Sequence, residues 1–79
     1  MEIKVLGTGC TNCKTLEKNT INALAELNIA ANVEKVEDIQ QIMSYGIMRT
    51  PGLVINGKVV ISGKVASTSE IKELIQKHQ

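Results

Sequence analysis

Residues 1–5 alternate between apolar and polar side chains, with Glu2 and Lys4 separating the apolar positions, and Leu6 extends the segment. A period of two is typical of a β-strand with one buried face. Beyond Gly9 the period lengthens to three or four residues, which predicts a helix that ends near Asn28. The side chains expected on its buried face are Leu16, Thr20, Ala23, Leu24 and Leu27.

A second strand is predicted over residues 32–36, where the pattern is weaker and the charges of Glu34 and Lys35 favour the edge of a sheet. Asp38 then opens a capping-box pattern, which predicts the start of a short helix that Gly46 ends. The residues expected on the buried face of this helix are Ile39, Ile42 and Met43.

Two β-branched runs, residues 53–55 and 59–61, flank the dipeptide Asn56-Gly57. This arrangement predicts a β-hairpin with a type I′ turn. A second capping box, Ser67–Glu70, marks the start of a last helix. Its inward residues are expected to be Ile71, Leu74 and Ile75.

The predicted order of elements is therefore βαβαββα. The first two strands should be parallel because a long helix connects them, and the last two antiparallel because a tight turn does. We expect an α/β protein with a four-stranded mixed sheet flanked by three helices. The length of 79 residues fits one domain spanning residues 1–79.

Composition excludes several classes of function. The formal net charge is +1, and acidic and basic residues are interspersed, so we expect no nucleic-acid partner. No apolar run is long enough to span a membrane, and Glu2 interrupts any leader-like start, so we expect no membrane partner either. These features predict a cytoplasmic protein, which we expect to be a monomer.

The candidate chemistry lies where the first strand ends and the first helix begins. Both cysteines of the chain, Cys10 and Cys13, stand there as a CxxC motif. If Cys10 is the N-cap, the unpaired N–H groups and the macrodipole lower the pKa of its thiol and favour the thiolate. Cys13 then falls at N3, within about 60° of Leu16, on the face that must be buried. One exposed, activated thiol beside one buried, resolving thiol is the arrangement that disulfide exchange requires.

A CxxC motif at the start of a helix also suits soft metal ions. Strand, loop, GxxCxxC and helix also open the copper-chaperone domains of the ferredoxin-like βαββαβ fold, so Cu(I) transfer is an alternative function. Two features disfavour it: Thr8 stands where those domains typically carry methionine, and a second helix replaces their early hairpin. A closed zinc site would need two further ligands, and His78 is distant in sequence.

The chain resembles the thioredoxin fold in its short form, and most closely the small prokaryotic CxxC proteins known as redox-active disulfide proteins. The resemblance covers essentially the whole chain and rests on three segments, which are Gly7-Thr8-Gly9-Cys10-Thr11-Asn12-Cys13, Thr50-Pro51-Gly52-Leu53-Val54-Ile55-Asn56-Gly57 and Gly63. It implies a minimal thioredoxin fold in which the Thr50–Pro51 bond is cis. It also implies that Thr50 and Pro51 lie beside Cys10 and bind an incoming peptide.

The resemblance implies a thiol–disulfide oxidoreductase with Cys10 and Cys13 as catalytic residues, and we expect neither a cofactor nor a bound metal. Its partners would be a protein or small-molecule disulfide and a dithiol or flavin-dependent reductase. A glutathione-dependent glutaredoxin is the other alternative. Glutaredoxins carry a Gly-Gly-x-Asp-like stretch for glutathione, where this chain has residues 61–64, Ile-Ser-Gly-Lys.

Overall fold

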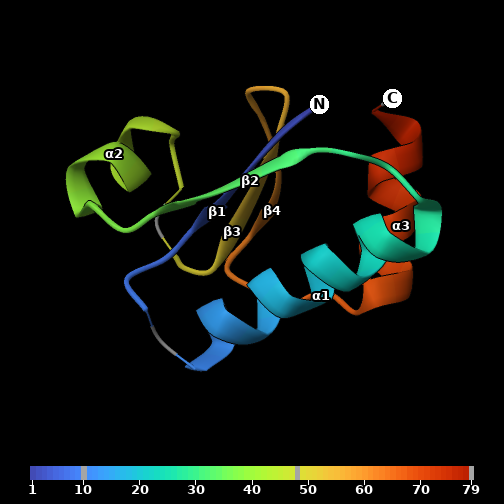
Figure 1. Cartoon of the computed structure of the whole chain (residues 1–79). Coiled ribbons are helices and arrows are strands. Elements are labelled where there is room, and N and C mark those ends of the chain that lie inside the picture. The colour runs from blue at the N-terminus through green and yellow to red at the C-terminus, as the bar shows by residue number, and fades with distance from the viewer. Residues whose placement is uncertain (10, 48, 79) are drawn as a thin grey trace.

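The computed structural model describes residues 1–9, 11–47 and 49–78 and has the predicted order of elements. Figure 1 shows the helices packed around one sheet. The elements are β1 (Glu2–Leu6), α1 (Thr11–Leu27), β2 (Asn32–Val36), α2 (Ile39–Ser44), β3 (Gly52–Ile55), β4 (Lys58–Ser62) and α3 (Thr68–Lys77).

The four strands form one mixed sheet in the order β2-β1-β3-β4. β1 runs parallel to β2 and antiparallel to β3, and β4 is antiparallel to β3. β1 is therefore central, and its register places Val5 opposite Leu53. The prediction that β2 is an edge strand is confirmed. Together with three helices on two faces, this is the arrangement expected of a minimal thioredoxin fold.

One face of the sheet is covered by α1 and α3 together (Figure 1). Alternation along the strands sends Ile3, Val5, Leu53 and Ile55 into this core, where each is 3% exposed or less. The helices contribute the complementary apolar residues Leu16, Ala23, Leu24, Ile71 and Ile75. The predicted inward faces of the two long helices are thus confirmed at these positions.

The opposite face is covered by α2 and the segment that follows it. Leu6 and Val54 pack there against Ile42 and Ile47. Lys4, on the same face of β1, donates a hydrogen bond of 3.2 Å to the Tyr45 hydroxyl. That bond is the main reason why the pKa of the Lys4 ammonium is raised, and it ties α2 to the central strand.

The prediction that Ile39 and Met43 face the core is wrong. Their side chains are 59% and 65% exposed, and within α2 only Ile42 is buried. A helix of six residues presents less than two full turns to the sheet, so one position suffices to fill the contact. Ile47, after the helix, supplies the rest of the apolar cover.

The predicted turn and the predicted starts of α2 and α3 are confirmed. Asn56 and Gly57 both have positive φ, of 50° and 82°, as a type I′ turn requires. Asn56 also accepts a hydrogen bond from the Glu2 backbone and donates one to the His78 carbonyl. Asp38 caps α2 through the Gln40 N–H.

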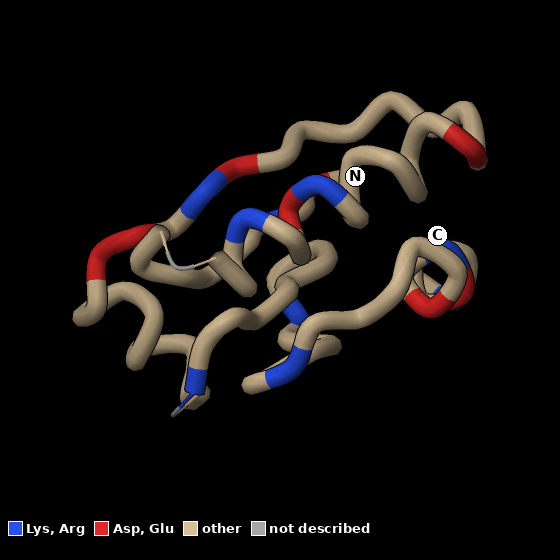
Figure 2. The backbone as a smooth tube through the Cα atoms, turned by 90° about the horizontal axis from the view of Figure 1, so that it is seen from below, with Lys and Arg blue, Asp and Glu red and all other residues tan. Residues whose placement is uncertain are grey.

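Acidic and basic residues are mixed along the described backbone and gather on no single element, as Figure 2 shows. Within the described ranges, no helix combines the length and the apolar character needed to cross a bilayer.

Candidate functional site

The candidate site begins at the carboxyl end of β1, where residues 7–9 lead into α1. The Gly7 N–H donates a 2.9 Å hydrogen bond to the Val36 carbonyl, which extends the pairing of β1 with β2 by one residue. Gly9 has a φ of 88°, a backbone conformation that residues other than glycine rarely adopt. The chain thus turns sharply from the sheet into the first turn of α1.

Cys13 lies in that first turn and is 5% exposed, which confirms the predicted burial of its side chain. Its sulfur takes part in a disulfide bond. Cys10 lies outside the described residues, so its predicted role as the N-cap and its exposure stay predictions.

Gly7 is in direct contact with the side chain of Cys13. A Cβ atom at position 7 would lie 2.8 Å from the Cys13 Cβ and closer still to its sulfur. The sequence pattern marks Gly7 only as a turn residue, and nothing in it reveals this contact. The glycine is needed because the strand end and the helix start approach each other at this point.

The Thr50–Pro51 peptide bond is cis, as the resemblance implies. Pro51 is buried and Thr50 is exposed. The Pro51 carbonyl accepts a 2.9 Å hydrogen bond from Gly63, which holds the loop against the end of β4. Among the described residues, the backbone groups of Thr50 have no hydrogen-bond partner, so an incoming chain has access to them.

A groove of about 280 Å³ joins this loop to the segment before the cysteines. Thr8 and Thr50 both line it, and they belong to the two loops that the resemblance expects to lie together. The remaining wall is apolar and consists of Ile39, Ile42, Met43 and Ile47. Ile39 and Met43, whose side chains were expected in the core, therefore lie at the rim of the candidate site.

A smaller cavity, of about 100 Å³, is lined by Cys13 together with Val5, Gly7 and Gly9. Its charged lining comes from Lys14 and Glu17 of α1, Lys35 of β2 and Glu37 just beyond β2. The Lys35 ammonium and the Glu17 carboxylate form an ion pair of 3.4 Å. Sequence reasoning missed this cluster, although the four-residue spacing of Cys13 and Glu17 places them on one side of a helix.

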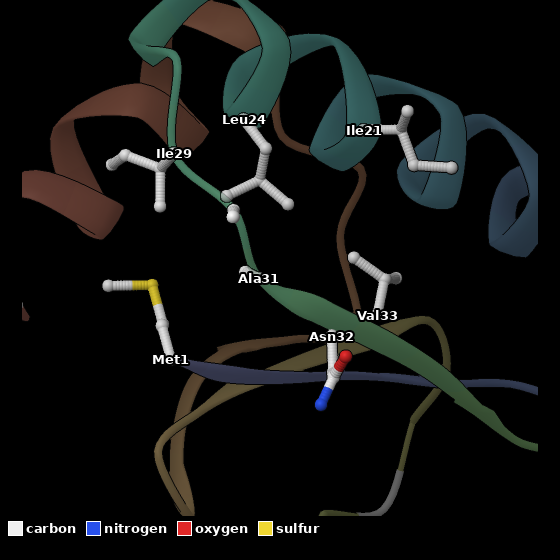
Figure 3. Close-up of a pocket in the computed structure, with 8 residues that line it drawn as sticks. Met1, Ile21, Leu24, Ile29, Ala31, Asn32 and Val33 are labelled. Atoms are coloured by element: carbon white, nitrogen blue, oxygen red, sulfur yellow. The ribbon is translucent and has the colours of Figure 1, made fainter.

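The other candidates of the sequence do not reach the site. His78 caps the carboxyl end of α3, where its N–H donates to the Ile75 carbonyl. A cavity of about 520 Å³ lies between the later turns of α1 and the start of β2 (Figure 3). Every labelled side chain around this cavity except Asn32 is apolar, so these side chains include no nucleophile and no acid or base. Among the described residues, no group of three His, Cys, Asp or Glu side chains is placed to hold a metal ion.

Comparison with known proteins identifies the family of this chain. A family model described as Thioredoxin domain matches residues 1–76. A thioredoxin of Methanothermobacter thermautotrophicus is 45% identical over 75 residues, which cover 95% of this chain and 97% of the relative. A thioredoxin of Methanocaldococcus jannaschii is 36% identical over 76 residues, covering 96% of this chain and 87% of the relative.

These matches favour neither the Cu(I) chaperone nor the glutaredoxin alternative. The observed order βαβαββα also differs from the βαββαβ order of ferredoxin-like copper chaperones. The fold, the cis bond before β3 and both relatives agree, and the chain therefore belongs to the thioredoxin domain family as a small thioredoxin-type redox protein.

Proposed function

We propose that the chain is a thiol–disulfide oxidoreductase whose reactive pair is Cys10 and Cys13. The observation that carries the proposal is the burial of Cys13 in the first turn of α1, directly behind the loop that leads from β1. A thiol in that position cannot meet a large substrate, but it suits attack on a disulfide formed at its neighbour. Cys10, three residues earlier, is then the thiol that meets the substrate.

The reaction has two balanced steps. The Cys10 thiolate attacks one sulfur of the substrate disulfide, and the substrate's other sulfur leaves as a thiolate. Cys13 then loses its proton and attacks the Cys10 sulfur, which releases the second substrate thiolate and leaves a Cys10–Cys13 disulfide. Two electrons pass to the substrate in each cycle.

A peptide substrate is supported by the surroundings of Thr50. Its free backbone groups provide a donor and an acceptor for an extended chain, which is the mode of strand addition. The neighbouring groove offers apolar contact to the residues that flank the substrate cysteine. We therefore propose Thr50 and Pro51 as substrate-binding residues, and a protein disulfide as the preferred substrate.

Turnover requires an external source of electrons. We propose a dithiol or flavin-dependent reductase in place of glutathione, because residues 61–64 lack the glutathione-binding stretch of glutaredoxins. We propose that the protein acts in the cytoplasm, where thiols stay reduced. We also propose that it acts as a monomer.

The test is the catalysed reduction of a protein disulfide, measured with dithiothreitol and separately with glutathione as the reductant. We expect faster catalysis with dithiothreitol and none with Cys10→Ser or Cys13→Ser under either condition. Efficient turnover with glutathione would favour the glutaredoxin alternative. Tight, selective Cu(I) binding by a wild-type protein without exchange activity would favour metal transfer.

A further inference from the structure

We propose that Arg49 selects protein disulfides whose reactive cysteine has an adjacent Asp or Glu, by binding that carboxylate beside the Thr50–Pro51 loop. This inference rests on the proposed function, because it concerns which substrates the same site accepts. Arg49 precedes Thr50 directly and is the only arginine of the sequence. A substrate chain that pairs with the backbone of Thr50 therefore runs past Arg49.

The side chain of Arg49 is positioned by its contact with Gly63. A Cβ atom at position 63 would lie 2.9 Å from the Arg49 Cβ and 3.3 Å from its Cδ, so the aliphatic part of Arg49 lies against this glycine. The Gly63 N–H donates the 2.9 Å hydrogen bond to the Pro51 carbonyl. Arg49, Pro51 and Gly63 are thus held together at the edge of the candidate site.

The positive charge of Arg49 has no counterpart within the protein. Arg49 is exposed, and across residues 1–9, 11–47 and 49–78 no carboxylate forms an ion pair with it. Lys64, which follows Gly63, is instead paired with Glu70 at 3.1 Å. An arginine stays charged, and its planar guanidinium can bind both oxygens of one carboxylate. Arg49 is therefore available to an acidic group that a substrate brings.

The sheet places Arg49 at one end of the site and acidic residues at the other. Its register aligns one residue of each strand in a row, in the order Val36, Leu6, Gly52 and Ser62. Glu37 and Asp38 follow the first of these, on the β2 edge of the sheet. Gly63, with Arg49 against it, follows the last, on the β4 edge. An acidic residue of the substrate is thus attracted to the β4 side.

The lysines on the β2 side do not reverse this difference. Lys14 and Lys35 line the cavity of about 100 Å³ together with Glu17 and Glu37, so two positive and two negative charges meet there. Lys35 is paired with Glu17 at 3.4 Å. The cation that remains without a carboxylate beside the Thr50–Pro51 loop is Arg49, and this favours an acidic substrate segment.

The experiment measures how fast the reduced full-length protein attacks four peptides, each with one cysteine in a mixed disulfide with thionitrobenzoate. Glu or Gln stands directly before or directly after the cysteine, and the peptides are otherwise identical. The Cys10 thiolate attacks the peptide sulfur, and thionitrobenzoate leaves as a coloured thiolate because it is the better leaving group. Each rate constant is divided by that of dithiothreitol with the same peptide, which removes the intrinsic reactivity of the disulfide.

For at least one placement of Glu, the normalised rate constant should be about fivefold above that of the matching Gln peptide. Arg49→Gln should bring this ratio to about one, and Arg49→Lys should keep part of it, because the charge remains while the planar fork is lost. The wild-type ratio should also fall in about 1 M salt, which screens exposed charges.

Lys58→Gln is the matched control, because it removes one exposed positive charge from the opposite end of β4 and should keep the wild-type ratio. The assignment is overturned if the wild type attacks Glu and Gln peptides at equal normalised rates, or if Arg49→Gln keeps the wild-type ratio. Loss of the ratio in Lys58→Gln as well would also overturn it, since net charge would then explain the effect. A wild type that releases no thionitrobenzoate from any peptide would contradict the proposed function itself.

Discussion

The contact between Gly7 and Cys13 determines how closely the end of β1 can approach α1. No side chain fits at position 7 while Cys13 keeps its place, because a Cβ there would overlap the cysteine side chain. Gly7 and Cys13 also line the charged cavity together. The close packing around Cys13 therefore requires that residue 7 has no Cβ atom.

Gly7→Ala tests this contact. We expect the oxidised protein to lose about 1–3 kcal/mol in its free energy of unfolding, the usual effect of overpacking a tight site. Chemical denaturation of the variant and the wild type measures the difference. Thr8→Ala, at the exposed neighbouring position, is the control and should change the stability little. Equal stability of Gly7→Ala and the wild type would show that the contact is not restrictive.

Residue-level prediction succeeded where helix geometry alone decides the outcome. The burial of Cys13 follows from its position relative to Leu16, and the structure confirms it. The cluster around Glu17 and Lys35 did not emerge, because the two residues come from different elements. Their meeting depends on how β2 lies beside α1, which a periodic pattern does not specify.

The start of α3 shows how local sequence fixes an element. Ser67 accepts a hydrogen bond from the Glu70 N–H, and the Ser67 hydroxyl donates one of 3.4 Å to the Glu70 carboxylate. Glu70 also pairs with Lys64 at 3.1 Å. The hydrogen bond from Lys64, followed by the one from the Ser67 backbone, lowers the pKa of the Glu70 carboxyl.

A lowered pKa in the folded state means that ionised Glu70 stabilises the fold at neutral pH. This stabilisation is present above the ordinary carboxyl pKa and is lost as the pH falls through the lower, folded value. We therefore expect Glu70→Gln to lower the melting temperature at neutral pH and to match the wild type in strong acid.

Thermal unfolding of the wild type, Glu70→Gln and Glu73→Gln over a pH series measures this effect. Glu73→Gln removes an exposed charge from the same helix and should show no comparable convergence. A gap between Glu70→Gln and the wild type that stays constant into strong acid would contradict the assignment to the carboxylate charge.

The face of α2 was the one element-level error. Capping and the glycine stop located the helix, but its apolar residues at three of six positions could not define a single buried stripe. The tertiary contact selects Ile42 and leaves Ile39 and Met43 beside the groove that Thr8 and Thr50 line. Ile39 and Met43 are thus apolar residues that line the groove of the candidate site and do not belong to the core.

At the scale of the whole molecule, connection lengths predicted the parallel and antiparallel pairings, and the charges of β2 predicted its edge position. The full strand order did not follow from pattern alone. The resemblance implied only a minimal thioredoxin fold and the cis bond at Pro51, and the structure supplies the order. The apolar groove and the charged cavity could not be predicted at all, because each combines side chains from distant segments that only the folded chain brings together.

The central claim is that the two cysteines have different roles, with Cys10 attacking the substrate and Cys13 resolving the intermediate. Covalent trapping of a disulfide-bonded protein substrate by the single-cysteine variants tests it most directly. Cys13→Ser should accumulate a mixed disulfide through Cys10, because attack remains and resolution is lost. Cys10→Ser should trap almost none, because Cys13 is buried. Equal trapping by both variants, or trapping by Cys10→Ser alone, would contradict the account.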